Sequence, residues 1–410
     1  MSESQANHTT RWFNRILNSR RKYFFEHFRD LNSWSDFSLF KMIGWLREDV
    51  VYLTTWKINI LLQLRTFGPG IRKEYGCSFL KQFYRMMVVA FIKRVQPKYF
   101  RSYLLFLDER WSKVDSFTFD QYEVQYKLVD ACCAEEKEIL QSKLRFYKYC
   151  KKLSFNSPEV LGAFDDGKII YQGNDKLQMP EADIFVKDIY GKSGQGTKRF
   201  YFHGDGYSDS EANFYSKEDI RNFLLNYSKE VRPTVVQKIE KNHSSWLPFT
   251  SGSLCTCRLV TVKMSSGNSI KPLFCMLRMP IGKSDADNFA LGGIASAIDL
   301  ETGVFKRAMA VKPINGRFQF DSHPDTGQPI TGIPLPHLDQ IINYAIKIHS
   351  TFKIPFLGWD VAMTENGPCV IEGNIGWGAD IVEATLNKPL IETEYPELFE
   401  DWFRSFQKKS

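Results

Sequence analysis

The stretch from Gly358 to Asn374, GWDVAMTENGPCVIEGN, constrains the fold of this 410-residue chain more than any other segment. It predicts two short apolar strands joined by a tight turn over residues 365–367. Gly367 can take the left-handed conformation that a three-residue hairpin turn needs. We expect Thr364 to pair with Pro368, and this register would place Asp360 opposite Glu372, because the side-chain period of a strand is two.

The predicted hairpin carries three oxygen ligands at fixed spacing. Opposed residues have Cβ atoms roughly 4.5–5.5 Å apart, so Asp360 and Glu372 could share a cation, and Asn374 points to the same face as Glu372. Two carboxylates and an amide suit Mg²⁺, which takes few protein ligands besides substrate phosphates. The alternative is a hairpin whose acidic residues face solvent. The apolar strand before Glu372 argues against it, because burying an unpartnered carboxylate is costly.

The composition allows two or three domains, with 43% hydrophobic residues to form their cores. The eight cysteines show no CxxC pair and no zinc-type spacing, which favours reduced thiols in a cytoplasm. The polar start, MSESQANHTTRW, lacks the apolar segment of a signal peptide. The longest apolar run of the N-terminal part, Met86–Ile92, is too short to span a bilayer. We therefore expect a cytoplasmic protein.

The N-terminal part is basic and aromatic. Residues 1–110 hold 19 Lys/Arg and 9 Asp/Glu, a net charge of +10, and helical spacing is present in Phe37–Thr54 and Ser78–Val95. One interpretation is a surface that docks on the inner face of a membrane, on a phosphorylated substrate or on a glycosyltransferase complex. The other, which we favour, is a helical domain with an aromatic core and solvated basic residues. No nucleic-acid-binding module is recognisable, so no nucleic-acid partner is expected.

From about Ala134 the pattern changes to a mixture of helices and short strands. Helical periodicity covers Glu135–Cys150, Ser216–Ser228 and Pro336–Thr351. This mixture indicates an α+β fold rather than regular βαβ repeats. Besides the hairpin, the β-type runs are Val160–Phe164, Lys168–Tyr171, Ile184–Lys187, Arg199–His203, Thr234–Ile239, Thr256–Lys263 and Leu273–Met279.

A second informative segment is the apolar strand that ends at Lys187, because a loop with three glycines follows it at Gly191–Thr197. Glycines let backbone N–H groups approach phosphate oxygens, and a lysine adds a positive charge to the same phosphates. The spacing is not that of a P-loop, since no GK[ST] opens a helix. The following strand at Lys198–His203 disfavours a dinucleotide-binding loop. Taken alone, such a loop is also typical of an ordinary hairpin turn.

A strand lysine, a glycine-rich loop, an apolar linking strand and a D…E-x-N hairpin together resemble the ATP-grasp superfamily. In those ligases ATP lies between two α+β subdomains. Their order resembles in particular the sugar-transfer-associated ATP-grasp group, over about residues 135–405. We expect a mainly helical N-terminal domain at 1–130 and an ATP-grasp domain at 131–410. Within the latter, we expect a lid subdomain at about 155–235 and a metal-binding subdomain at about 236–405.

The resemblance implies a role for each matching residue in ATP binding. Lys143 and Lys187 resemble the two phosphate lysines, although Lys143 could instead be a solvated helix lysine. A hinge strand would pair its backbone with adenine, and Glu240 would bind the ribose unless it is an exposed strand-end charge. The loop residues that would close over the phosphates are Ser193, Gly194, Gln195 and Gly196, and the hinge residues are Gln237, Lys238 and Ile239.

The resemblance also implies the metal and catalytic groups. Asp360 with Glu372 would hold one Mg²⁺, and Glu372 with Asn374 a second. Many ATP-grasp ligases have an arginine two residues before the first metal carboxylate, where this chain has Gly358. Arg258, in an apolar strand, would supply that cation by contacting a phosphate oxygen, or would form a structural ion pair, since a buried arginine needs an anionic partner. Arg278 is the competing candidate, and Lys187 completes the predicted catalytic set.

This combination predicts an ATP- and Mg²⁺-dependent carboxylate–amine ligase. The resemblance implies a substrate such as a uronic acid or amino-sugar unit of a surface glycan, joined to an amino acid. Asp287, Asn288 and His323 could shape the acceptor pocket or be ordinary loop residues. Two alternatives stay open: a kinase acting on a sugar or small-molecule hydroxyl, and a non-catalytic nucleotide-binding scaffold in a glycan assembly complex.

Overall fold

A computed structural model describes residues 39–92, 95–118, 125–126, 129, 133–173, 179–191, 197–282 and 292–407. They form two compact units, each built from segments that are distant in sequence. The first unit comprises residues 1–121, 312–318 and 378–410, and the second comprises 122–311 and 319–377. The domain boundaries expected from the sequence stay predictions, because they follow chain order whereas these units do not.

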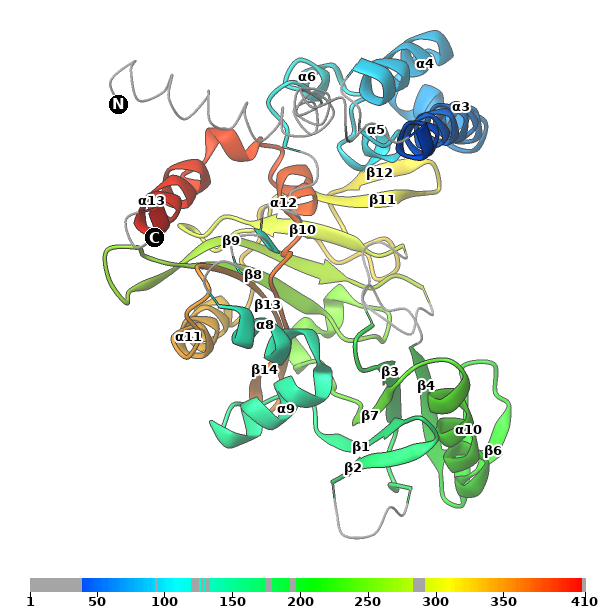
Figure 1. The fold of residues 1–410 in the computed structure, drawn as a ribbon, viewed down its shortest axis with the longest axis vertical. Helices are drawn as coiled ribbons and strands as arrows, with labels where there is room; N and C mark the ends of the chain where they lie inside the picture. The colour runs from blue at the N-terminus through cyan, green and yellow to red at the C-terminus, as the bar shows by residue number, and fades with distance from the viewer. Residues whose placement is uncertain are drawn as a thin grey trace. The chain divides into compact units, whose positions relative to one another are not determined.

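The first unit is helical. Its long helix α3 is followed by α4 after a turn in which Gly76 has a φ of +68° and Ser78 caps α4 by accepting a hydrogen bond from the Lys81 amide at 3.3 Å. Pro69 lies inside α3, which continues well past the predicted end at Thr54. The unit's described elements (Figure 1) are α3 (Leu39–Tyr75), α4 (Phe79–Met87), a π-helical turn (Val88–Ile92), α5 (Lys98–Ser102), α6 (Asp108–Trp111), α12 (Ala379–Leu386), a 3₁₀ turn (Leu390–Glu392) and α13 (Tyr395–Gln407).

A buried carboxylate joins the two ends of the chain inside this unit. Glu383 of α12 is fully buried and accepts hydrogen bonds from the Tyr103 hydroxyl at 2.8 Å, from the Thr118 amide and from the Leu390 amide. Arg110 donates to the Ala384 carbonyl at 2.9 Å. The C-terminal helices therefore share one core with the N-terminal ones.

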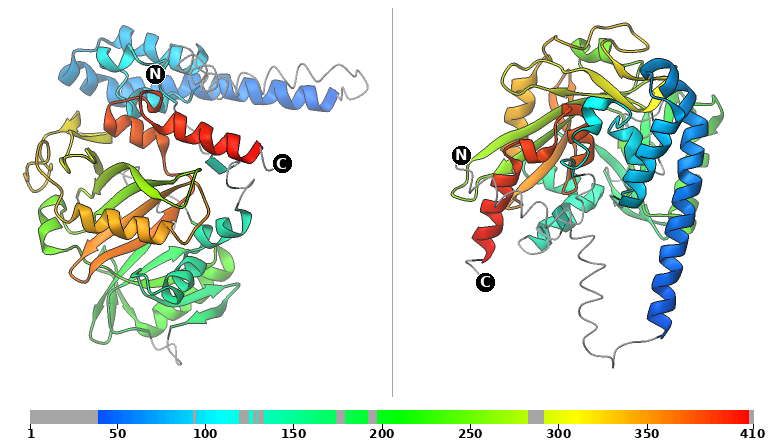
Figure 2. Two further views of the ribbon diagram at one scale, coloured as in Figure 1. Left: turned by 90° about the vertical axis from the view of Figure 1, so that its left-hand side faces the viewer. Right: turned by 90° about the horizontal axis from the view of Figure 1, so that it is seen from above.

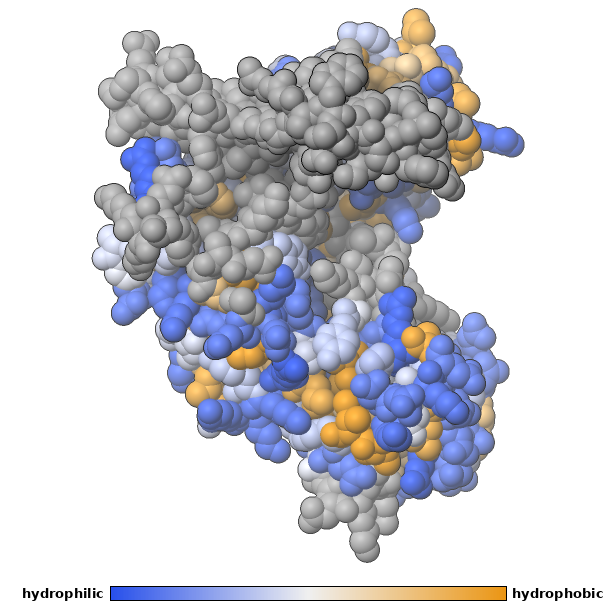
Figure 3. Space-filling view, viewed as in Figure 1, coloured by the Kyte–Doolittle hydropathy of each residue, from blue (hydrophilic) through white to orange (hydrophobic). Residues whose placement is uncertain are grey.

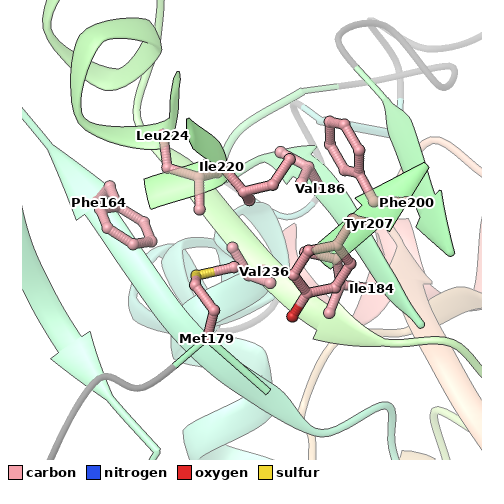
Figure 4. Packing of buried hydrophobic residues seen from close by; sticks show 9 residues of the cluster. All are labelled: Phe164, Met179, Ile184, Val186, Phe200, Tyr207, Ile220, Leu224 and Val236. Atoms are coloured by element: carbon pink, nitrogen blue, oxygen red, sulfur yellow. The ribbon is translucent and has the colours of Figure 1, made fainter. Parts of the chain in front are cut away.

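The second unit contains a seven-stranded antiparallel sheet in the order β2-β1-β7-β3-β4-β5-β6. Helix α10 (Lys217–Glu230) starts with a capping box between Ser216 and Asp219 and packs on one face. Figure 4 shows the nine buried side chains between them, among them Phe164, Ile220 and Val236. The strands are β1 (Val160–Asp165), β2 (Lys168–Gln172), β3 (Ile184–Asp188), β4 (Lys198–His203), β5 (Gly206–Ser208), β6 (Phe214–Ser216) and β7 (Thr234–Lys238).

A second sheet has the order β12-β11-β10-β9-β8-β13-β14. Helix α11 (Leu338–His349) covers one of its faces (Figure 2). On that face His349 bonds to the Thr261 hydroxyl at 2.6 Å, and Trp359 donates to the same oxygen. The opposite face carries the candidate site. The strands are β8 (Thr256–Lys263), β9 (Ile270–Met279), β10 (Ile294–Ile298), β11 (Ala308–Ile314), β12 (Arg317–Phe320), β13 (Phe356–Thr364) and β14 (Gly367–Asn374).

The stretch Glu135–Cys150, predicted as one helix, is two: α8 (Ala134–Gln141) and α9 (Lys143–Lys152). Ser142 breaks the helix, since it is extended (φ −112°, ψ 114°) and caps α9 by accepting a hydrogen bond from the Arg145 amide. Helix α9 packs Leu144 and Tyr147 on the first sheet, while its Phe146 stacks on Trp359 of the second. The mixed helix and antiparallel-sheet content confirms the predicted α+β fold class with a helical N-terminal region.

The described part of the chain contains no helix with both the length and the apolar character that a membrane span requires.

Candidate active site

The hairpin β13–β14 forms with Asp360 opposite Glu372, as predicted, but by a different route. Thr364 pairs with Gly367 rather than with Pro368, so the expected pairing at the tip is wrong by one residue. A β-bulge between Asp360 and Val361 compensates for this difference. One extra residue on β14 shifts the register back, which is what a bulge does in an antiparallel pair.

The carboxylates lie in a row of charged residues that crosses three strands. Arg258 of β8 pairs with Asp360 of β13, which pairs with Glu372 of β14. The Arg258 guanidinium contacts both Asp360 oxygens, with Nε–Oδ1 and Nη2–Oδ2 distances of 2.7 Å. Arg278 of β9 reaches the same carboxylate, at 2.8 Å from its Nη2 to Oδ2. The predicted candidates Arg258 and Arg278 therefore both belong to the site, joined through Asp360.

Asp360 is fully buried and keeps its charge because of these arginines. Burial by itself would raise the pKa of Asp360, but Arg258 and Arg278 outweigh it and hold that pKa well below its usual range. The anionic partner that a buried arginine needs is thus present within the protein. Arg258 forms the structural ion pair that was the alternative to a phosphate contact, and the two are compatible because a guanidinium has five N–H donors.

Glu372 and Asn374 lie beside this ion pair and are more accessible. The Glu372 side chain is 37% exposed, and partial burial together with the Asp360 carboxylate raises the pKa of Glu372. The Asn374 amide nitrogen is 3.3 Å from Glu372 Oε1 and 3.5 Å from Asp360 Oδ2. The three predicted metal ligands therefore converge. Two carboxylates and an amide fit Mg²⁺ by their hard-oxygen chemistry, whereas the described residues contain no cluster of three His, Cys, Asp or Glu side chains suited to a metal.

Trp377 packs against Gly358, the position at which the resemblance to ATP-grasp ligases led us to look for an arginine. A Cβ atom built on Gly358 would lie 2.5 Å from the Trp377 Cβ, so no side chain fits there. Trp377 is fully buried, and its carbonyl accepts a hydrogen bond from Arg258 Nη1 at 3.4 Å. Arg258 of the neighbouring strand β8 places a guanidinium beside Asp360.

Lys143 lies where the glycine-rich loop begins. Its ammonium donates to the Gly191 carbonyl at 2.6 Å, and its own amide donates to the Ile189 carbonyl. Burial lowers the pKa of Lys143, while the carboxylates of Glu372 and Asp188 oppose that shift. Lys143 is therefore not a solvated helix lysine. It bonds to the loop and lies within electrostatic reach of Glu372 on the β13–β14 hairpin. The loop residues Ser193, Gly194, Gln195 and Gly196 lie outside the described residues.

Lys187 and Glu240 also lie near the hairpin. Lys187 ends the apolar run of β3, with its ammonium 4.7 Å from the Phe185 ring centre. Burial raises the pKa of the Cys369 thiol on β14, the Glu240 carboxylate raises it further, and Lys187 lowers it. All three side chains are therefore within electrostatic range. Glu240 is half-buried, and this burial raises its pKa.

The hinge residues of β7 already use some of their backbone groups. Gln237 is buried and pairs with Phe185, the Lys238 amide donates to the Glu159 carbonyl at 2.9 Å, and the Ile239 amide donates to the Asp183 carbonyl at 3.3 Å. The last bond is long. An adenine bound through the Ile239 amide would have to replace it.

Of the candidate acceptor-pocket residues, only His323 is described; Asp287 and Asn288 lie outside the described residues. His323 is buried, its Nε2 lies 3.0 Å from the Pro280 carbonyl, and its Nδ1 accepts from the amides of Asp325 and Thr326. These contacts hold a turn, so His323 has the ordinary loop role that was the alternative.

The sequence interpretation missed two residues of the site. Thr256 accepts hydrogen bonds from Arg278, at 2.9 Å from Nε, and so orients that guanidinium. Its position two residues before Arg258 on the same strand face could have indicated this. Trp377 follows the hairpin after a turn, and nothing in the local sequence indicates that it packs against Gly358.

The two-sheet unit with a carboxylate hairpin and strand-end lysine has the arrangement expected of an ATP-grasp protein. The family model for sugar-transfer associated ATP-grasp proteins matches residues 126–393. The chain belongs to this family, which confirms the resemblance proposed from the sequence.

The solved structures that match this chain include three ligases. The L-amino acid ligase of Bacillus licheniformis is 11% identical, with a TM-score of 0.34 over 60% of this chain and 44% of its own. The Bacillus anthracis D-alanine–D-alanine ligase complexed with ATP is 11% identical (TM-score 0.37, 66% and 69% covered). The ligase PsnB complexed with a precursor variant, Mg and ADP is 10% identical (TM-score 0.33, 66% and 60%). This chain thus spans less than half of the L-amino acid ligase. No curated protein matches it significantly.

Proposed function

We propose that this protein is an ATP- and Mg²⁺-dependent ligase that activates a carboxylate as an acyl phosphate and joins it to an amine. The observation that carries the proposal is the convergence of Arg258, Arg278, Asp360, Glu372 and Asn374 on one sheet face. Lys143 adds a further cation within electrostatic reach of Glu372. Such a set combines ligands for a divalent cation with cations for a polyphosphate.

The metal would be held by Glu372 and Asn374, with Asp360 shared between the metal and its arginines. When bound, Mg²⁺ would supply positive charge that offsets the negative charge developing on the phosphates during phosphoryl transfer. The ligand set favours two ions, because Glu372 has two oxygens and has Asp360 and Asn374 as neighbours, so that each could complete a different ion site with it.

The protein's own cations would orient and stabilise the reacting phosphate. Asp360 fixes the guanidinium planes of Arg258 and Arg278, so these groups need little reorganisation when charge develops. Lys143 and Lys187 would bind the phosphates from the side of the glycine-rich loop, and Glu240 would bind the ribose.

In the proposed reaction a substrate carboxylate oxygen attacks the γ-phosphorus, the bond to the β–γ bridging oxygen breaks, and ADP leaves. An amine nitrogen then attacks the acyl carbon, the carbon–oxygen bond to phosphate breaks, and the amine loses a proton. The products are an amide, ADP and inorganic phosphate. The family description, sugar-transfer associated, supports a sugar acid, an amino sugar or an amino acid linked to a surface glycan as substrate.

The test is a phosphate-release screen with Mg-ATP across pairs of sugar acids and amines, including amino acids. We expect release only when both substrates are present, and its loss in Glu372→Gln. The matched control is Glu365→Gln, which alters the exposed carboxylate at the tip of the same hairpin.

A stable phosphoryl product formed with one substrate alone would favour the kinase alternative. If Mg-ATP produced a thermal shift but no pair of substrates released phosphate, and Glu372→Gln behaved like the native chain, the scaffold alternative would be correct.

A further inference from the structure

Helix α3 has two apolar stripes, and only one of them is used by the core. Trp56, Ile60 and Ile71 are buried. Ile58, Leu61 and Leu62 lie on the other side of the helix at i, i+3 and i+4, and are all more than half exposed, Leu61 to 61%. A single exposed leucine is ordinary, but a helical stripe of them marks an interaction surface.

Helix α4 carries a second set of exposed apolar side chains. Phe79, Leu80, Phe83 and Tyr84 are exposed, Leu80 to 78%. The two helices form a close antiparallel hairpin, since Gln82 donates to the Gly68 carbonyl at 3.1 Å and to the Cys77 carbonyl at 2.7 Å. Figure 3 shows apolar residues gathered at the upper right, where Figure 1 places α3 and α4. We call the exposed set Ile58, Leu61, Leu62, Phe79, Leu80, Phe83 and Tyr84 the α3–α4 face.

The charge around the α3–α4 face is mainly positive. Residues 55–87 contain a single acidic residue, Glu74, which pairs with Arg317 at 3.3 Å. Arg65 and Arg72 follow Ile58 by seven and fourteen residues, so they share its stripe. Asp108, from outside this segment, pairs with Lys81 and Arg85. Arg85 is buried, and the exposed basic residues of the segment are Lys57, Arg65, Arg72, Lys73 and Lys81.

We propose that the α3–α4 face binds an anionic lipid surface peripherally. Its leucines and aromatic rings would enter the boundary between headgroups and acyl chains, and its basic residues would bind the phosphates of the headgroups. The excess of exposed cations favours an anionic lipid surface over a protein groove, because a lipid surface carries negative charge opposite every one of these cations. The proposal concerns the first unit alone and does not depend on the ligase activity.

The test is co-sedimentation of the full-length chain with phosphatidylcholine vesicles, with and without phosphatidylglycerol. We expect binding only to the anionic vesicles and a decrease as salt rises. The double variant Leu61→Ser/Leu80→Ser should lower the affinity for anionic vesicles by about tenfold or more, since it removes apolar area from the interface. Lys57→Gln/Arg65→Gln should weaken binding and its salt dependence together.

Matched controls remove equally exposed residues elsewhere. Val231→Ser/Leu247→Ser removes exposed apolar side chains of the second unit, and Lys241→Gln/Lys388→Gln removes exposed lysines outside the α3–α4 face. Both should bind like the native chain, and all variants should keep the native thermal shift with Mg-ATP. No binding to anionic vesicles, equal binding to neutral ones, or equal loss in the controls would overturn the proposal. In the first case the face would belong to a protein partner.

Discussion

Asp360 and Glu372 are neighbours across one strand pair, yet their surroundings shift their pKa values in opposite directions. Two guanidinium groups hold the pKa of Asp360 below its usual range, while partial burial and the Asp360 charge raise that of Glu372. Asp360 therefore holds the two arginines in place, and Glu372 is the more accessible of the two carboxylates. A site whose neighbouring carboxylates differ in this way can assign them different roles.

The first prediction concerns these two carboxylates. Asp360→Asn should lower the free energy of unfolding by about 3–5 kcal/mol, because it leaves buried guanidinium groups without their counter-charge. Glu372→Gln should change it by less than about 1 kcal/mol, because Glu372 is partly exposed. Urea unfolding of both variants measures the difference. Equal losses in the two variants would show that the arginines do not depend on Asp360.

At the scale of elements, the site depends on irregularities rather than on ideal strands and helices. The bulge after Asp360 restores the register with Glu372, and Ser142 ends one helix so that Lys143 begins the next. Trp377 occupies the space above Gly358. The bulge places Glu372 opposite Asp360, and the helix break lets Lys143 reach the Gly191 carbonyl.

The second prediction tests the packing at Gly358. Gly358→Ala should destabilise the chain by about 1–3 kcal/mol, because the new methyl group overlaps Trp377 in a packed core. The control is Gly267→Ala, whose Cβ would meet nothing within 4 Å. Thermal and urea unfolding compare the two. If Gly358→Ala unfolded like the control, Trp377 would not be what excludes an arginine from this position.

At the scale of the whole molecule, the first unit is completed by residues from the C-terminus. Glu383 of α12 binds Tyr103 and Thr118 in its buried network. Burial raises the pKa of Glu383 to about 7, although the hydrogen bonds that it accepts act against this shift. The unit's stability is therefore linked to pH.

The third prediction follows from that linkage. Because the folded-state pKa of Glu383 is raised, its contribution to stability is fully present below the unfolded pKa, near 4.5, and is lost as pH rises through about 7. The loss should be about 3 kcal/mol, since one pKa unit corresponds to about 1.4 kcal/mol.

Glu383→Gln should remove most of this dependence, because the amide does not titrate. Unfolding of the full-length chain, measured at about pH 5 and about pH 8, compares the two proteins over the range in which Glu383 titrates. In the native chain, the contribution of Glu383 to the free energy of unfolding should be larger at the lower pH than at the higher pH. An unchanged difference in Glu383→Gln would assign the pH dependence to another residue.

The fold class, the hairpin and the position of Lys187 after the apolar run of β3 could be predicted from the sequence, whereas the register that opposes Asp360 to Glu372 depends on a bulge that the turn pattern did not predict. The predictable features follow from short-range periodicity and turn chemistry, which act over a few residues. Three contacts became visible only in the folded chain. Arg258 and Arg278 share Asp360, and Trp377 leaves no room for a side chain at Gly358. Lys143 reaches the start of the glycine-rich loop. Those contacts join strands and helices far apart in the chain, and their partners are chosen by burial and charge balance, which no local pattern encodes.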